Sequence, residues 1–255
     1  MEKVTVITIC YNCKEDLVKT IKSVKGQTYK DKEFVIIDGG SSDGTLQVIE
    51  SEKDHIDYWS SEPDHGIYDA INKGIGHATG EWIICMNAGD IFADNNVLSD
   101  IFSKDIPKQT SVIYSDYWAL TPGNYLNLCL MDRSKGKVMH QAFIYRRSLH
   151  DKYGLYLVTK PYICSDLQFM LMIPEDEYMK TPTIISITKY GGVSQSSTWC
   201  DECSLGLKIA FRIETFDHAF INYKIAVLKK MIPGKIKFFI KKFILRQSYQ
   251  KYIER

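Results

Sequence analysis

One stretch, Ser61–Asp90, constrains the fold more than any other part of this 255-residue chain. It contains an acidic turn, a helical segment interrupted by glycines, and the short apolar run Trp82–Met86. A short and wholly apolar run predicts a strand that is buried on both faces of a parallel sheet. Polar residues follow this run directly. Because ligands of open α/β sheets bind beyond the carboxyl ends of the strands, Asn87–Asp90 is expected to hold a ligand or a metal.

Predicted strands and helices alternate along the first half of the chain. Strands are predicted at Val4–Ile9, Phe34–Ile37, Ile56–Ser60, Trp82–Met86 and Val112–Tyr114. Helices are predicted between them: one with Leu17, Val18, Ile21 and Val24 on one face, one capped by Asp43, one at Gly66–His77 and one at Asn95–Phe102. This order indicates right-handed βαβ units and an α/β fold, in which a Rossmann-like, mainly parallel sheet is flanked by helices.

The periodicity is weaker from Tyr117 onward. Aromatic and polar turns there predict an added half that covers the ligand edge of the sheet. Helices are predicted at Ser165–Ile173 and Cys203–Tyr223, and a strand at Thr183–Thr188. The chain length fits one large domain, so residues 1–116 and 117–223 are expected to be two halves of that domain. Residues 224–255 are expected to form a basic helical tail.

The charge of the chain is unevenly distributed. From Lys224 to Arg255 there are ten Lys or Arg residues and one acid, a net charge of +9; since the whole chain carries +1, the remainder carries −8. Apolar residues between Ile236 and Phe243 share one helical face in this tail. The tail is either an interfacial helix on an anionic membrane or a packed helix with a solvated basic face. Nucleic-acid binding is not favoured, because no aromatic-basic recognition motif accompanies the charge.

The seven cysteines and the distribution of apolar residues indicate in which cellular compartment the protein is expected. Two pairs, Cys10 with Cys13 and Cys200 with Cys203, have the spacing of zinc ligands. However, Cys10 ends a predicted strand and Cys200 lies in a predicted polar loop, so reduced thiols of a cytosolic protein are the better interpretation. The sequence has neither a leader-like start nor a run of about 18 apolar residues, which also favours a cytoplasmic protein.

Four segments of the first half form a set with specific order and spacing. They are VITICYN at 6–12, FVIIDGGSSDGT at 34–45, the acidic turn and helix at 61–80, and IICMNAGD at 83–90. This set resembles the nucleotide-sugar-binding half of family 2 glycosyltransferases, which have the GT-A fold. Segments 140–147, 165–171 and 189–197 are similar to the acceptor-side pieces of small bacterial members. The resemblance implies a nucleotide-sugar-binding half at 1–116, an acceptor-side half at 117–223 and transfer with inversion.

Sugar transfer from a nucleoside diphosphate requires a pocket for the base, acceptors for the ribose hydroxyls and a cation for the leaving diphosphate. The resemblance places Tyr11, Asp38 and Asp64 in the nucleoside site. Tyr11 can stack on a base, and Asp38 can accept from a base N–H or a ribose hydroxyl. Thr8 and Lys73 belong to the same predicted donor site. The alternative is that Tyr11 only packs and that Asp38 only caps its loop.

Asn87 and Asp90 occupy the position of the family's metal-binding acidic triplet. Gly89 stands where the first acid of the closing pair is usual. Mg²⁺ or Mn²⁺ can bind through one carboxylate together with substrate phosphates and water, so Asp90 is predicted as the metal ligand. The alternative role of Asp90 is to cap the following helix.

An inverting transfer needs a base beside the acceptor hydroxyl, because a neutral alcohol is a poor nucleophile. The resemblance assigns this role to Asp166 at the start of the segment SDLQFML, where Ser165 replaces the first member of the usual acidic pair. The alternative is an Asp favoured there by the helix dipole. His140 and Gln141 are predicted to lie near the donor phosphate or the acceptor, and a core histidine is the alternative for His140.

Together these features predict a glycosyltransferase that moves a sugar from a nucleotide donor to a hydroxyl of a lipid-linked bacterial surface glycan. One rival is a sugar nucleotidyltransferase, but the segment after the first strand lacks the Gly-rich basic loop that such an enzyme needs. A second rival is a non-catalytic protein, peripheral at the membrane, that binds nucleotide sugars or glycans. The replacements at Gly89 and Ser165 leave that second possibility open.

Overall fold

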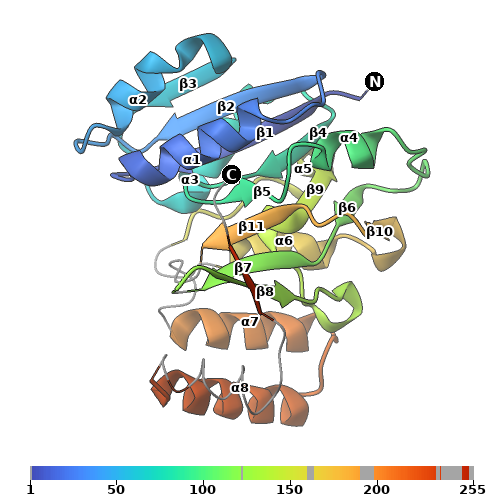
Figure 1. Cartoon of the computed structure of the whole chain (residues 1–255). Coiled ribbons are helices and arrows are strands. Elements are labelled where there is room, and N and C mark those ends of the chain that lie inside the picture. Colours follow the sequence, from blue (N-terminus) through green and yellow to red (C-terminus); the bar gives the residue numbers. More distant parts are fainter. Residues whose placement is uncertain are drawn as a thin grey trace.

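A computed structural model describes residues 2–121, 123–159, 164–189, 198–233, 236 and 249–252. In this part of the chain, a central seven-stranded sheet lies between two layers of helices, and a smaller five-stranded sheet lies beside it (Figure 1). Two further helices, α7 (Thr198–Ala210) and α8 (Phe216–Met231), lie on the far side of the smaller sheet in the view of Figure 1. Short 3₁₀ turns are η1 (Lys53–His55), η2 (Arg133–Lys135), η3 (His140–Ala142) and η4 (Glu175–Glu177).

The central sheet has the strand order β10-β6-β9-β4-β1-β2-β3. Its strands are β1 (Val4–Cys10), β2 (Lys32–Asp38), β3 (Tyr58–Ser61), β4 (Trp82–Cys85), β6 (Val112–Tyr114), β9 (Phe143–Arg146) and β10 (Tyr178–Lys180). Strands β1 to β4 are parallel to their neighbours among themselves, whereas β9 runs antiparallel between β4 and β6. The predicted α/β fold with a mainly parallel sheet is therefore confirmed.

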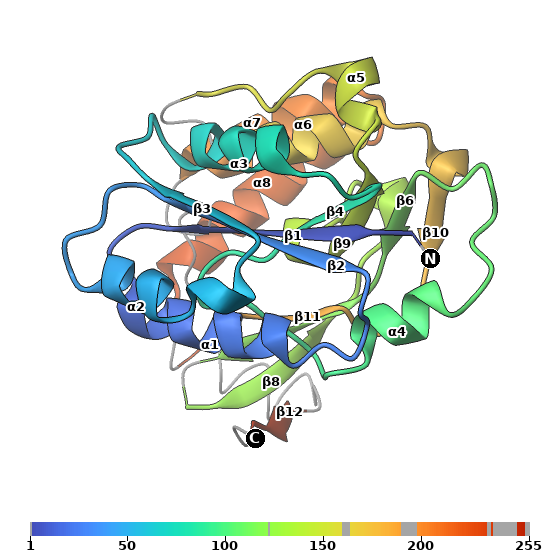
Figure 2. The same ribbon diagram turned by 90° about the horizontal axis from the view of Figure 1, so that it is seen from above.

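Helices cover both faces of this sheet (Figure 2). On one face are α1 (Lys14–Lys25), α2 (Thr45–Ser51) and α4 (Val97–Phe102), and on the other are α3 (Ile67–His77), α5 (Leu149–Tyr153) and α6 (Ser165–Met172). Successive side chains of a strand point to opposite faces, so Ile36 packs in the core under α1 while Ile37 packs in the core under α3. Strands buried on both faces explain the uninterrupted apolar runs of the sequence.

The buried stripe of α1 differs by one residue from the prediction. Leu17, Ile21 and Val24 are buried as expected, but Val18 is 47% exposed. Thr20 is buried in its place, and its hydroxyl contacts the loop after β4. The prediction was wrong for Val18 because residue 18 lies one step, about 100°, around the helix from Leu17 and outside the stripe that faces the sheet.

The second sheet was not predicted. Its order is β12-β8-β7-β11-β5, formed by β5 (Ile91–Phe92), β7 (Tyr117–Thr121), β8 (Tyr125–Cys129), β11 (Ser186–Lys189) and β12 (Tyr249–Lys251). The region after Tyr117 therefore begins with a β-hairpin rather than with turns alone. The strand predicted at Thr183–Thr188 corresponds to β11, which starts three residues later. β5 follows Asp90 directly and pairs with β11, so this sheet adjoins the predicted ligand loop.

Two helices, α7 (Thr198–Ala210) and α8 (Phe216–Met231), replace the single helix predicted at Cys203–Tyr223. Arg212 has a φ of +56°, a left-handed conformation that ends a right-handed helix. Cys200 is buried within α7, so its assignment to a polar loop was wrong. The amphipathic segment between Ile236 and Phe243 lies almost wholly outside the described residues. In the described part of the chain, no helix has the length and apolar character needed to cross a bilayer.

Candidate functional site

The ends of four parallel strands meet at one edge of the central sheet. Cys10 of β1 lies opposite Asp38 of β2, which in turn lies opposite Ser61 of β3. The loop after β4 joins the same edge, because the backbone N–H of Ala88 donates to the carbonyl of Ile9 at 3.1 Å. Parallel strands bring their carboxyl ends together, so the predicted donor and metal residues gather here.

Tyr11 and Asp64 flank Gly39 at this edge. A Cβ atom added to Gly39 would lie 2.6 Å from Asp64 Oδ2 and 3.3 Å from Tyr11 Cδ2. The absence of a side chain at this position therefore allows the carboxylate and the ring to come close together. Tyr11 is 63% exposed, which leaves its ring free to stack on a planar base. Asp64 also accepts a 2.7 Å hydrogen bond from the N–H of Gly66, which fixes the turn that leads into α3.

Asp38 is fully buried, and both of its carboxylate oxygens accept hydrogen bonds within the protein. Oδ2 accepts from the N–H of Ser41 at 2.9 Å and from the hydroxyl of Ser61 at 2.6 Å, and Oδ1 accepts from the hydroxyl of Ser41. Asp38 therefore holds its own loop to the end of β3. Any nucleoside contact of Asp38 has to coexist with these bonds or replace one of them.

Thr8 and Lys73, the other two residues assigned to the donor site, make internal contacts. Thr8 is buried and donates a 2.7 Å hydrogen bond to the carbonyl of Met86, which ties β1 to the end of β4. The ammonium of Lys73 lies 3.0 Å from Glu62 and 3.6 Å from Asp69, and it donates to the carbonyl of Pro63 at 3.2 Å. Both residues therefore stabilise the edge of the sheet: Thr8 joins two strands, and Lys73 holds the acidic turn against α3.

The loop Asn87–Asp90 is held by Thr20 of α1. The N–H of Gly89 donates to the Thr20 hydroxyl at 2.9 Å, and that hydroxyl lies 2.8 Å from the carbonyl oxygen of Asp90. Burial raises the pKa of Asp90 to about 7, and the nearby Asp16 carboxylate adds to the rise. The N–H of Lys189 donates to Asp90 Oδ1 at 3.2 Å, and this hydrogen bond lowers the pKa of Asp90 and so opposes the effect of burial. A carboxylate held in these surroundings gains charge stabilisation when a cation binds.

Gly89 has a structural reason to replace the acid that is usual in the family. Its φ is +98°, and an added Cβ would lie 3.3 Å from Asp16 Cγ. An L residue with a side chain is strained at such a φ and would press against α1. The only carboxylate that this loop contributes is therefore that of Asp90.

The donor set at the end of β4 fits a hard divalent cation. Asp90 supplies a carboxylate, and Asn87 supplies a buried amide oxygen, Oδ1, that has no hydrogen-bond partner among the described residues. Carboxylate and amide oxygens are the ligands that Mg²⁺ and Mn²⁺ prefer, with substrate phosphate and water completing the shell. No group of three or more His, Cys, Asp or Glu side chains with metal-binding geometry occurs among the residues that the structure describes. A metal held here would thus rely on few protein ligands.

Asp166 lies in the first turn of α6 and is half-buried. Its Oδ1 accepts a 2.7 Å hydrogen bond from the phenol of Tyr68, a residue of the first turn of α3. Burial raises the pKa of Tyr68, and the Asp166 charge raises it further, so the phenol stays protonated and donates. The fold thus places the predicted base against the helix that follows the acidic turn of Asp64.

His140 is buried in η3, and its Nε2 lies 3.2 Å from the hydroxyl of Tyr156. Burial lowers the pKa of His140, against the opposing effect of the Asp166 charge, so the ring is neutral at neutral pH. This environment matches the core histidine that was the alternative in the sequence analysis. Gln141 is half-buried beside it, where antiparallel pairing of β9 with β4 brings η3 close to the end of β4.

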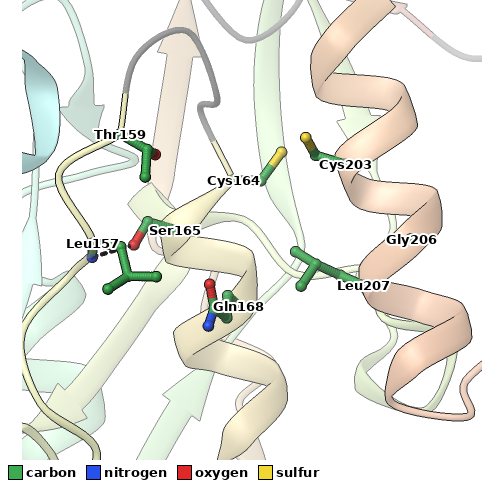
Figure 3. Close-up of a pocket in the computed structure, with 8 residues that line it drawn as sticks. All are labelled: Leu157, Thr159, Cys164, Ser165, Gln168, Cys203, Gly206 and Leu207. Atoms are coloured by element: carbon green, nitrogen blue, oxygen red, sulfur yellow. Dashed lines mark hydrogen bonds between the residues drawn. The ribbon is translucent and has the colours of Figure 1, made fainter.

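A cavity of about 310 Å³ lies between α6 and α7 (Figure 3). Its wall is mainly apolar and consists of Leu157, Thr159, Cys164, Ser165, Gln168, Cys203, Gly206 and Leu207. Ser165, the neighbour of Asp166, contributes to this wall, and its hydroxyl accepts from the N–H of Leu157 at 2.6 Å. The cysteines of the chain are free thiols, and those of Cys164 and Cys203 point toward one another in the cavity.

Sequence reasoning missed four residues that organise this site. Tyr68 orients Asp166, Thr20 and Asp16 support the loop after β4, and Lys189 reaches that loop from β11. The Lys189 ammonium also lies 2.7 Å from Asp16 Oδ2. Tyr68 and Lys189 lay in segments already singled out, at 61–80 and 189–197, but neither was assigned a role; residues 190–197 lie outside the described part of the chain.

Comparisons of the sequence with known proteins identify its family. The sequence profile of "Glycosyl transferase family 2" matches residues 5–114. The chain is 32% identical over 183 residues to the uncharacterized glycosyltransferase Rv1514c of Mycobacterium tuberculosis, covering 66% of this chain and 67% of that protein.

Two solved structures are similar in fold. Residues 1–349 of S. aureus TarS in complex with UDP-GlcNAc match with a TM-score of 0.66 at 15% identity, over 85% of this chain and 69% of that chain. The mannosyltransferase PcManGT of Pyrobaculum calidifontis, in complex with GDP-Man and Mn²⁺, matches with a TM-score of 0.64 at 13% identity, over 96% and 80%. The chain thus has the GT-A fold, and it belongs to glycosyltransferase family 2.

Proposed function

We propose that this glycosyltransferase moves a sugar from a nucleotide-sugar donor to a hydroxyl of a lipid-linked glycan in bacterial surface polysaccharide synthesis. The observation that carries the proposal is that Tyr11 and Asp64 flank Gly39 at the carboxyl edge of the sheet, which the loop Asn87–Asp90 after β4 also joins. Donor complexes with UDP-GlcNAc and GDP-Man in proteins of the same fold support a nucleotide sugar as the ligand.

In this proposal the donor site is divided between two groups of residues. Tyr11 stacks on the base, while Asp38 and Asp64 accept from the nucleoside. Asp90 and Asn87 would hold Mg²⁺ or Mn²⁺, and the cation would supply positive charge to offset the negative charge of the departing diphosphate. The Mn²⁺ in the PcManGT complex supports a divalent cation.

Asp166 acts as the base in the proposed reaction. The acceptor oxygen attacks the anomeric carbon while its proton passes to the Asp166 carboxylate. The bond from the anomeric carbon to the diphosphate oxygen breaks, and the nucleoside diphosphate leaves with the electron pair. Attack from the side opposite to the leaving group inverts the anomeric centre. Tyr68 keeps the carboxylate in place through its 2.7 Å hydrogen bond.

A lipid-linked acceptor is supported by the apolar cavity beside Asp166 and by the basic tail. Ser165, next to the proposed base Asp166, lines the cavity of about 310 Å³, so an apolar group attached to the acceptor could bind there close to the base. The net charge of +9 from Lys224 onward favours contact with an anionic surface. We therefore infer a peripheral location at the inner face of the cytoplasmic membrane.

The test is a panel of UDP-, GDP- and dTDP-sugars, each measured for protection against thermal unfolding with and without Mn²⁺. One donor class should raise the unfolding temperature, and Mn²⁺ should increase the shift. Mass spectrometry of the same mixtures should then detect hydrolysis or transfer. Protection without any turnover would favour the non-catalytic binding protein, and no protection by any donor would contradict the proposed site.

A further inference from the structure

The helix α8 carries its large apolar side chains on the side that faces solvent. Six of them are exposed: Phe216 by 64%, Phe220 by 44%, Ile221 by 54%, Ile225 by 42%, Leu228 by 63% and Met231 by 76%. At about 100° per residue they fall within roughly half of the helix circumference. We call these six residues the outer face of α8.

The opposite side of α8 makes the contacts with the rest of the protein. Ala219 is fully buried, and the hydroxyl of Tyr223 donates a 2.6 Å hydrogen bond to Glu202 Oε1 of α7. A surface helix of a water-soluble domain normally turns its apolar stripe inward. In α8 the least exposed residues are Ala219, Tyr223, Ala226 and Val227, whereas the six largest aliphatic and phenylalanine side chains face outward. Such an exposed apolar surface marks an interaction site.

Charge distinguishes between the kinds of partner that could cover this face. Lys224 lies within the outer face, with its ammonium 5.1 Å from the centre of the Phe220 ring, and the exposed Lys229 lies at its margin. The acid on this side, Asp217, is in the first turn, where the helix dipole favours a negative charge. Two copies of the face would bring their lysines together, which disfavours self-association. An anionic lipid surface accepts both the apolar side chains and the lysines.

The geometry points to α8 as a helix that lies in the plane of an anionic membrane with its outer face among the lipid headgroups and upper acyl chains. Its 16 residues give a length of about 24 Å, so it lies along the surface. The long stem of Lys224 lets its ammonium remain at headgroup level while the neighbouring rings are buried. The inference refines the membrane contact of the proposed function, moving it from the tail alone to a defined surface that begins at Phe216.

Co-sedimentation of the full chain with vesicles tests the inference without donor or acceptor, so its outcome is independent of catalysis. The vesicles contain phosphatidylcholine alone or with phosphatidylglycerol. The unmodified chain should bind the anionic vesicles, and Leu228→Glu should weaken that binding by about tenfold or more, because it places a charge in the apolar layer. Leu130→Glu is the matched control: Leu130 is 67% exposed, close to the 63% of Leu228, and it lies outside α8.

Oxidation of Met231 gives a second measurement that needs no variant. Mild peroxide should convert exposed Met231 to its sulfoxide, and anionic vesicles should slow this reaction several-fold, with the half-buried Met131 as internal reference. Equal vesicle binding by the two Leu variants, or an unchanged oxidation rate of Met231, would overturn the inference. A dimer in sedimentation velocity that Leu228→Glu dissociates would also overturn it, in favour of a second copy.

Discussion

The phenol of Tyr68 donates a 2.7 Å hydrogen bond to Asp166 across 98 residues of sequence. Tyr68 belongs to α3, directly after the acidic turn that carries Asp64, whereas Asp166 opens α6 in the second half of the chain. A single contact therefore ties the proposed base to the helix beside the donor edge. It holds the carboxylate of Asp166 against the first turn of α3, and it makes Tyr68 a positioning residue.

Replacement of Tyr68 by Phe tests this role. The ring remains in the core, but the carboxylate of Asp166 loses the hydrogen bond that fixes its orientation. The value of kcat should therefore fall, while nucleotide affinity measured by calorimetry is retained. Tyr29→Phe is the control, since Tyr29 donates to the carbonyl of Glu2 away from the site. An unchanged kcat for Tyr68→Phe would leave Tyr68 with a packing role only.

Asp166→Asn is the complementary change at the proposed base. The amide keeps the size of the side chain but cannot take a proton, so transfer should fall by roughly 100-fold or more while donor affinity is retained. Transfer is measured under single-turnover conditions and donor affinity by calorimetry. Near-native transfer by this variant would show that Asp166 is not the base. Asp116 is a poor substitute, because its Oδ1 already lies 2.7 Å from the Lys180 ammonium and accepts from the N–H of Met131.

A side chain at position 89, including the acid that is usual in the family, should destabilise the folded protein. Gly89→Ala should lower the free energy of unfolding by about 1–3 kcal/mol, because φ is +98° at this residue. Gly89→Asp should lower it further, since the new carboxylate would lie beside Asp16 and Asp90. Urea unfolding measures both, with Gly76→Ala as the control, because an added Cβ at Gly76 has nothing within 4 Å. Equal stability of the Gly89→Asp variant and the unmodified protein would contradict the strain.

Asp38 and Asp64 should differ in what they contribute. Asp38→Ala removes the hydrogen bonds that a buried carboxylate accepts from Ser41 and Ser61 and should cost about 1–3 kcal/mol of stability as well as nucleotide affinity. Asp64→Ala should reduce nucleotide affinity with a smaller loss of stability, because Asp64 is half-buried and accepts one hydrogen bond among the described residues, from the N–H of Gly66. Calorimetry with UDP and GDP, together with urea unfolding, separates the two effects. Unchanged nucleotide affinity in the Asp38 variant would reduce Asp38 to a loop-fixing residue.

The sequence predicted the parts of the fold that follow from local patterns. β1, β2 and β4 are runs of apolar residues buried on both faces, so their strand character and their parallel order could be inferred. The insertion of β9 between β4 and β6 could not, since it depends on pairing between residues such as Ile84 and Ile144 that lie far apart in sequence.

Contacts between residues far apart in sequence also limited what could be predicted of the site and of α8. Asp38, which ends β2, and Asp90, in the loop after β4, were found because the carboxyl ends of parallel strands lie at one edge of the sheet. Tyr68, Thr20 and Asp16 act through contacts between separate elements, and no local motif marks them. In α8 the apolar residues could be seen in the sequence, but periodicity alone does not tell which side of a helix faces the protein.

Glu33 offers a test of stability against pH that is independent of function. It is buried at the end of the sheet opposite to the site, and its carboxylate accepts from the Thr5 hydroxyl at 2.6 Å, from the N–H and hydroxyl of Thr79 at 2.8 and 2.7 Å, and from the Lys3 ammonium at 3.2 Å. Burial alone would raise the pKa of Glu33, but these hydrogen bonds outweigh it and lower the pKa to about 2.

Because the pKa of Glu33 is lower in the folded protein than in the unfolded chain, its ionisation stabilises the fold fully above about pH 4.5, and this contribution disappears as the pH falls toward 2. A depression from about 4.5 to about 2 corresponds to roughly 3 kcal/mol. The Glu33→Gln variant cannot ionise, so its deficit in the free energy of unfolding should be constant from pH 7 to 5 and should shrink between pH 4 and 2.5. Urea unfolding at each pH measures the deficit, and Glu50→Gln at an exposed site is the control. A deficit that does not change with pH would show that the charge of Glu33 is not what its hydrogen bonds stabilise.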